Sequence, residues 1–261
     1  MRNEASQHID RMDTLSMVRL INEENMNAVR AVEAASEQIA AVCDAVSERF
    51  EKGGRLFYVG AGTSGRLGVM DAAECPPTFG VPREQVVGVI AGGEKCMVRA
   101  AEAQEDDAAA GENDLRAHAL CDKDVVIGIS ASGGSAYVVG ALEYANRVGA
   151  LSVSLASNAD SPIERVAKLA IVTDTGAEVI TGSTRMKSGT AQKLVLNMIS
   201  TCAMIKTGKV YENMMINLKP TNKKLRARMI RIVTEIKNCD EEEAERLLND
   251  HNWIIRDAVE A

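Results

Sequence analysis

Residues 55–80 read RLFYVGAGTSGRLGVMDAAECPPTFG, and this stretch decides the fold that we expect. It opens on an apolar run at 56–59 with glycines on both sides, which is typical of a buried parallel strand. Glycines at 60, 62 and 65 then let the backbone turn sharply and approach a ligand. A helical pattern follows from Arg66, so the loop would present backbone N–H groups at a helix N-terminus, where an anion binds well.

Glu74 lies late in this predicted helix, directly before Cys75 and the prolines at 76 and 77. Prolines remove helical hydrogen bonds, so we expect the pair to end the helix. A carboxylate late in a helix opposes the helix dipole, which favours a functional role for Glu74 over a solvated one. Cys75 has no histidine near it in the sequence, and we expect no catalytic role for it.

Four further apolar runs alternate with helical patterns along the chain. Strands rich in valine and isoleucine that alternate with helices indicate a parallel sheet covered on both faces. We therefore predict an α/β fold, a three-layer αβα sandwich with a five-stranded parallel sheet. The further predicted strands are 85–90, 124–129, 150–156 and 169–172, and the main predicted helices are 95–111, 137–147 and 188–206.

The two ends of the chain lie outside this alternating pattern. Residues 1–51 read as an arm followed by two helices, with a polar break at 22–27, and 52–210 form the main domain. Residues 211–261 predict a small helical appendage. In it Asp240 is placed as a helix N-cap, with acidic residues in the following turn.

Composition excludes several classes of function. A net charge of -7 and 3% aromatic residues argue against a nucleic-acid surface. The six cysteines form no CxxC pair, and the three histidines have no spacing that suits a metal site or a triad. No apolar run approaches the roughly 18 residues of a membrane span. We expect a soluble cytoplasmic protein that uses no metal and no redox cofactor and binds neither nucleic acid nor membrane.

Three loops rich in hydroxyl groups stand between strands and helices. One hydroxyl in such a loop is usually a turn or cap residue, but three loops at one sheet edge favour a phosphate cradle. The GxGxxG pattern of the first loop also suits a dinucleotide, yet the second strand ends in AGG at 91–93 without the acid that a ribose needs. The candidate binding residues are Gly62, Thr63, Ser64, Gly65, Ser130, Ser132, Gly133, Glu178, Ser183, Thr184, Arg185 and Lys187.

Two long motifs, GTSGRLGVMDAAECPPTFG at 62–80 and VITGSTRMKSGTAQKLVLNMIS at 179–200, resemble those of N-acetylmuramic acid 6-phosphate etherases. These enzymes belong to the sugar isomerase (SIS) superfamily. RN at 2–3, INEEN at 21–25 and GKVYENMMINLKPTN at 208–222 extend the similarity over nearly the whole chain. The resemblance implies a lyase of amino-sugar salvage that releases D-lactate from the sugar phosphate. It implies that Glu74 donates a proton and that Glu105 acts in the same site, and we expect a homodimer.

The chain also departs from the family pattern. Gly134, Ser135 and Ala136 stand where the family usually has an arginine and a proline, and Gln104 replaces a glycine before Glu105. These changes leave open an altered substrate preference. Two other readings also stay open, a non-catalytic sugar-phosphate sensor and an aldose–ketose isomerase.

Overall fold

The sheet of the main domain confirms the predicted topology. The computed structural model describes residues 2–99 and 102–261, with only the backbone at 102 and 103. Within them, parallel strands pair in the order β2-β1-β3-β4-β5. The order reverses at β1, so the loops after β1 and β3 flank the switch point at which such sheets bind ligands. The strands are β1 (Leu56–Gly60), β2 (Val86–Ile90), β3 (Val125–Ile129), β4 (Leu151–Ala156) and β5 (Leu169–Val172).

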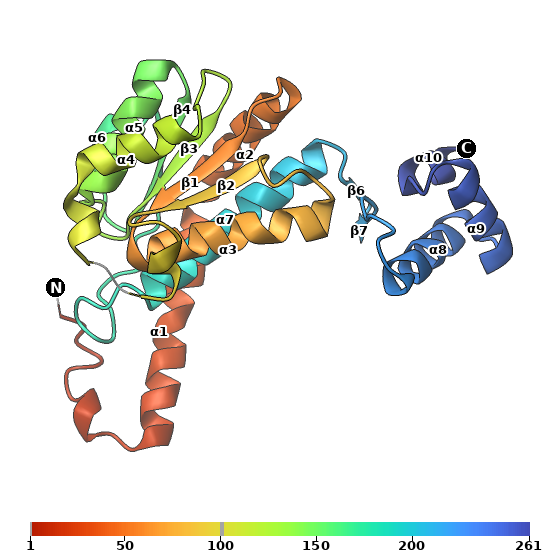
Figure 1. Cartoon of the computed structure of the whole chain (residues 1–261). Helices are drawn as coiled ribbons and strands as arrows, with labels where there is room; N and C mark the ends of the chain where they lie inside the picture. The colour runs from red at the N-terminus through yellow and green to blue at the C-terminus, as the bar shows by residue number, and fades with distance from the viewer. Residues whose placement is uncertain (1, 100–101) are drawn as a thin grey trace.

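Helices cover both faces of this sheet, which gives the three layers expected (Figure 1). Alternate residues of β1 point to opposite faces: Leu56 and Tyr58 join one apolar core, whereas Phe57 and Val59 join the other. The first core is covered by α1 (Thr14–Ala34), α2 (Ser36–Glu51), α3 (Gly62–Phe79) and α7 (Lys187–Lys206), the second by α4 (Ala108–Ala117), α5 (Ala136–Val148) and α6 (Pro162–Val166).

The N-terminal helices break at a different place from the one predicted. A short 3-10 turn (Ile9–Arg11) precedes α1, which runs without interruption through residues 22–27. That segment is polar but holds no glycine or proline, so its residues cost little in a helix. The break falls at Ala35 instead, where buried residues on both helices turn toward α7.

Helix α3 also differs from the prediction at both ends. It begins at Gly62, four residues before the predicted start, and it continues through Pro76 and Pro77. The prolines remove only the last internal hydrogen bonds of the helix, so they do not end it. Gly80 ends it, with φ of 65° and an N–H that donates to the carbonyl of Pro76.

The predicted single helix over 95–111 is wrong before residue 108 in the part that the structure describes, and residues 108–111 are helical as the first residues of α4 (Ala108–Ala117). Two 3-10 segments, η2 (Glu94–Met97) and η3 (Glu102–Asp106), precede α4. The carboxylate of Asp107 accepts the N–H of Ala110 and so starts a separate helix.

The C-terminal residues form a helical unit with its own apolar core (Figure 1). Asp240 caps α9 through the N–H of Glu243, as the sequence predicts. A small hairpin that the sequence did not predict connects this unit to the main domain. After the hairpin, the side chain of Asn217 donates to the carbonyl of Phe79 at the end of α3. We propose residue 210 as the boundary of the main domain. The elements are β6 (Val210–Tyr211), β7 (Met214–Met215), α8 (Lys223–Lys237), α9 (Glu241–Asp250) and α10 (Ile255–Glu260).

Candidate active site

The first turn of α3 is built to receive an anion. No side chain caps the helix at Ala61, and the first helical hydrogen bond runs from the N–H of Gly65 to the Ala61 carbonyl, at 3.2 Å. The N–H groups of Gly62, Thr63 and Ser64 precede that bond and lie at the positive end of the helix dipole.

Glycine at position 65 holds this turn against the sheet. A Cβ there would lie 2.5 Å from the Gly60 carbonyl oxygen and 2.7 Å from Cγ1 of Ile90. Any side chain would push the start of α3 away from the end of β1. Gly62 has φ of 52°, the left-handed region that favours glycine.

The loop after β3 is folded by its own hydroxyls. The hydroxyl oxygen of Ser130 accepts the N–H of Gly133 at 3.1 Å, and that of exposed Ser132 accepts the N–H of Gly134 at 3.2 Å. Gly133 has φ of 74°, and a Cβ there would lie 2.2 Å from Cβ of Ser161. Ser130 and Ser132 therefore shape the turn beside the switch point.

The loop before α7 lies against the first turn of α3. The N–H of Gly189 donates to the carbonyl of Thr184, and a Cβ on Gly189 would lie 3.5 Å from the methyl group of Thr63. The hydroxyl of Ser64 lies 2.9 Å from Oε1 of Gln192, one turn further along α7. Ser183, Thr184 and Arg185 precede this contact, and Arg185 is exposed.

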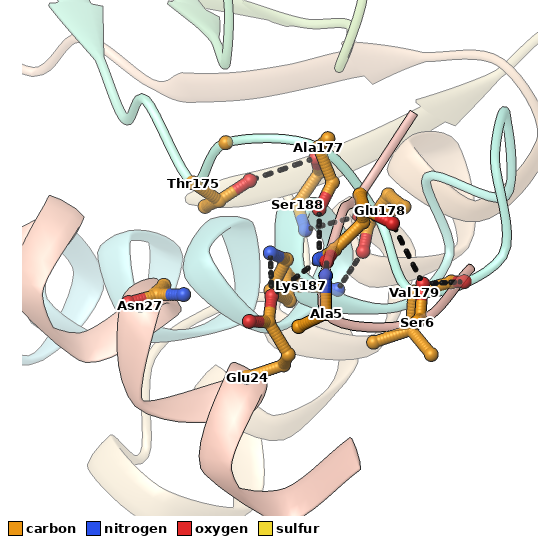
Figure 2. A network of polar contacts seen from close by, with 12 residues as sticks. Ala5, Ser6, Glu24, Asn27, Thr175, Ala177, Glu178, Val179, Lys187 and Ser188 are labelled. Atoms are coloured by element: carbon orange, nitrogen blue, oxygen red, sulfur yellow. Dashed lines mark hydrogen bonds and ion pairs between the residues drawn. The ribbon is translucent and has the colours of Figure 1, made fainter. Parts of the chain in front are cut away.

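Glu178 and Lys187, two other candidates, take part in a buried polar network (Figure 2). The Glu178 carboxylate accepts the N–H groups of Lys187 and Ser188, at 3.0 and 2.9 Å, so it caps α7. The Lys187 ammonium lies 2.6 Å from the carboxylate of Glu24 on α1, and Asn3 donates to the same carboxylate. The ammonium of Lys187 therefore faces α1.

Electrostatics of this network follow from burial. The side chain of Lys187 is 1% exposed and that of Glu24 is 16% exposed. The hydrogen bond from Lys187 lowers the pKa of Glu24 below its usual value of 4.5. In the last third of α3, by contrast, burial raises the pKa of Cys75 to about 12, so this thiol stays protonated near neutral pH.

Glu105 lies at the same sheet edge as the loops. It is half-buried in η3, and its carbonyl accepts the hydroxyl of Ser135, at the start of α5, at 3.3 Å. This contact holds η3 beside the loop that follows β3.

Glu74 lies far from the first turn of α3 within its own chain. It is exposed and follows Gly62 by twelve residues, about 18 Å along the axis of α3. Since α3 runs back along strands that are about 16 Å long, Glu74 lies toward the N-terminal ends of the strands, away from the loops. Exposed Met70 lies one turn before it on the helix.

Sequence reasoning missed Gln192, Glu24 and Asn3 as members of this region. Asn3 and Glu24 occur in the RN and INEEN motifs, which were available signals, whereas Gln192 gave no signal beyond its place in the 179–200 motif. Among the described residues, no group of three or more His, Cys, Asp or Glu gathers to hold a metal ion. In the same residues, no helix combines the length and apolarity that a membrane crossing requires.

The chain is similar to known proteins in both sequence and fold. Residues 38–146 match the family model of the glucokinase regulatory protein N-terminal SIS domain, and residues 108–201 match that of the SIS domain. The N-acetylmuramic acid 6-phosphate etherase of Pasteurella multocida is 53% identical over 258 residues, which cover 99% of this chain and 86% of that protein. The protein of the same name from Halalkalibacterium halodurans is 50% identical, with 99% and 87% covered.

Solved structures share the fold at low identity. A phosphoheptose isomerase from Francisella tularensis superposes with a TM-score of 0.56 at 15% identity, over 74% of this chain and 100% of that one. The phosphoheptose isomerase of Neisseria gonorrhoeae gives a TM-score of 0.54 at 18% identity, over 73% and 98%. The main domain therefore has the SIS fold.

Proposed function

Because the chain belongs to the N-acetylmuramic acid 6-phosphate etherase family, we propose that it cleaves the D-lactyl ether at C3 of N-acetylmuramic acid 6-phosphate. The products are N-acetylglucosamine 6-phosphate and D-lactate, in the salvage of cell-wall amino sugars. The observation that carries this proposal is 53% identity over 99% of the chain. Six free cysteines and a phosphorylated substrate fit a reducing cytoplasm.

We assign the phosphate of the substrate to the first turn of α3. The N–H groups of Gly62, Thr63 and Ser64 and the helix dipole suit a dianion, and no side chain among the described residues caps them. The loops of Ser130 and Ser183 border this turn and would enclose the sugar. Arg185 is exposed beside them and can add a charge-assisted contact.

The chemistry requires two carboxyl groups in opposite protonation states. In the open-chain sugar, the C1 aldehyde acidifies the proton on C2, and we assign its removal to Glu105. Electrons of the C2–H bond form the C2–C3 double bond as the C3–O bond breaks, and Glu74 gives its proton to the departing lactyl oxygen. Water then adds to C3 and C2 regains a proton, which restores the sugar. Such a division needs environments that separate the pKa values of the two acids.

The position of Glu74 leads us to place it in the active site of a second copy. About 18 Å of helix separates Glu74 from the phosphate end of its own α3, which exceeds the length of one hexose. In a symmetric dimer, two antiparallel α3 helices would bring Glu74 of each chain to the first turn of the other. Each site would then combine Glu105 and α3 of one chain with Glu74 of its partner.

Exposed apolar side chains support such a homodimer. Met70 on α3 and Met198 on α7 are 42% exposed, and Val18 on α1 is 58% exposed. Helices α1 and α3 both pack on α7, so these side chains lie on neighbouring helices.

The activity is tested by adding N-acetylmuramic acid 6-phosphate to the purified chain and measuring D-lactate. We expect steady release by the wild type and a loss of about 10²–10⁴-fold in Glu74→Gln and in Glu105→Gln. Both variants should still bind N-acetylglucosamine 6-phosphate. Absence of lactate from a folded wild-type chain refutes the activity, and full turnover in either variant removes the role of that glutamate.

A sugar-phosphate sensor is the second candidate. The match of residues 38–146 to the glucokinase regulatory protein domain favours it. Such a protein would gain thermal stability with hexose 6-phosphates and turn none of them over. The lactate assay therefore separates the two candidates, and formation of fructose 6-phosphate would instead reveal an isomerase.

A further inference from the structure

We propose that Gln192 is a positioning residue that turns the hydroxyl of Ser64 into a hydrogen-bond donor for the phosphate of the substrate. The inference rests on the proposed function, because it takes the first turn of α3 as the phosphate site. It adds a residue from α7 that touches no substrate atom and acts through Ser64.

The contact joins two buried side chains. Ser64 is the third residue of α3 and is 8% exposed, and Gln192 on α7 is 1% exposed. The hydroxyl of Ser64 lies 2.9 Å from Oε1 of Gln192. The amide nitrogen Nε2 of Gln192 is buried and has no hydrogen-bond partner among the described residues.

In this arrangement the NH₂ group of Gln192 is unpaired among the described residues and the hydroxyl proton of Ser64 points toward Gln192, away from the phosphate site. If Ser64 donates its only proton to Gln192, the hydroxyl has none to give to a phosphate, which only accepts. The buried NH₂ group of Gln192 meanwhile lacks an acceptor, which is unfavourable. Both problems have the same source, the orientation of one amide.

A half-turn of that amide gives Nε2 an acceptor and frees the Ser64 proton, and Oε1 then takes the buried place that Nε2 leaves. With Nε2 toward Ser64, the amide donates to the hydroxyl oxygen, and the hydroxyl proton is free to point out of the helix toward the anion. The oxygen and nitrogen of an amide occupy nearly the same volume, so the turn needs no repacking. A bound phosphate would favour the turned arrangement because it supplies the acceptor that the Ser64 proton then needs.

The test is calorimetric titration with N-acetylglucosamine 6-phosphate, a product that is not turned over. Gln192→Met keeps the volume and removes the amide, and we expect it to weaken binding about tenfold. Gln192→Glu introduces a carboxylate that holds the Ser64 proton and repels the phosphate, so binding should weaken further at neutral pH. In the lactate assay, KM should rise in Gln192→Met while kcat changes less than about twofold.

Gln85→Met is the matched control, because the amide of Gln85 donates to the carbonyl of Gly54 before β1. This contact lies at the edge of the sheet opposite the loops, and the variant should bind like the wild type. Thermal unfolding without ligand shows whether each variant is folded. If Gln192→Met does not fold, Gln192→Glu, which keeps the shape of the side chain, decides alone.

A double-mutant cycle distinguishes positioning from general packing. If Gln192 acts through Ser64, adding Gln192→Met to Ser64→Ala should weaken binding no further. Wild-type affinity in folded Gln192 variants, or losses that simply add, would overturn the inference while the phosphate site stands. A wild-type chain that does not bind the sugar phosphate contradicts the proposed function itself, and the inference with it.

Discussion

Helices α3 and α7 both begin after loops rich in glycine, serine and threonine, yet their N-termini differ. In the part of the chain that the structure describes, no side chain caps the first turn of α3, whereas that of α7 is capped by the buried carboxylate of Glu178. The dipole of α7 is thus already satisfied by an anion of the protein, and the first residue of α7, Lys187, is paired with Glu24. The two loops are similar in composition, yet the N-terminus of α3 is open to an anion and the N-terminus of α7 is closed by Glu178.

The difference shows what the two loops contribute. The polar network at the start of α7 connects the 174–178 segment, α1 and the N-terminal arm, because Asn3 contacts both Glu24 and the carbonyl of Ala177. This network holds the loop of Ser183 beside the open turn of α3. Stability and ligand binding are divided between the two helix starts, and four predictions test that division.

The largest effect on stability is expected from Lys187→Met. It leaves the carboxylate of Glu24 partly buried without its cation, and the free energy of unfolding should fall by about 3–5 kcal/mol in urea denaturation. Lys206→Met is the control at the other end of α7, because Lys206 pairs with Asp44 on the exposed surface. It should leave stability unchanged. Equal losses in both variants would contradict the structural role of the buried pair.

Glu178→Ala should lower the free energy of unfolding by about 2 kcal/mol, because the buried N–H groups of Lys187 and Ser188 lose their acceptor. The variant also opens the start of α7. Titration with inorganic phosphate should then detect a second, weaker site in addition to the one at α3. A variant as stable as the wild type would show that Glu178 is not the cap of α7.

Asp240→Ala is expected to lower the free energy of unfolding by about 1 kcal/mol, the usual value for an exposed N-cap. Asp240 caps α9 through the N–H of Glu243 at the surface of the C-terminal unit. Amide hydrogen exchange in α9 should accelerate, with lactate release unchanged. A loss as large as that of Glu178→Ala would mean that burial does not distinguish the two caps.

The smallest effect is a dependence of stability on pH. The pKa of Glu24 lies below its usual value of 4.5 because Lys187 donates to the carboxylate. The stabilisation is therefore complete above pH 4.5 and is lost as the pH falls through the lower, folded-state pKa. Unfolding curves should show the gap between wild type and Lys187→Met narrowing in acid. A gap that stays constant would contradict the ion pair as its source.

Much of the fold follows from the sequence, because buried parallel strands are continuous apolar runs that glycines bound. The break between α1 and α2 and the continuation of α3 through Pro76 do not follow, since packing against α7 and the last helical turn decides them. The open turn at Gly62–Ser64 is readable from its glycines. The cap at Glu178 cannot be predicted from the sequence, because Glu178 precedes Lys187 by nine residues and no local motif places its carboxylate at the start of α7.

The same limit holds for the two glutamates. Sequence places each on its element, but the distance along α3 that separates Glu74 from the phosphate site becomes visible only when the helix is found to begin at Gly62. A helix that began at Arg66 would have placed Glu74 only about 12 Å along the axis from its first residue. The proposal that two chains build each site follows from this length.

The most direct measurement isolates mixed dimers of one Glu74→Gln chain and one Glu105→Gln chain, using two affinity tags, and assays D-lactate release. If each site takes Glu105 from one chain and Glu74 from its partner, one of the two sites retains both acids, and activity should return to about half of the wild-type value. Mixed dimers as inactive as the two parent variants would contradict the shared site.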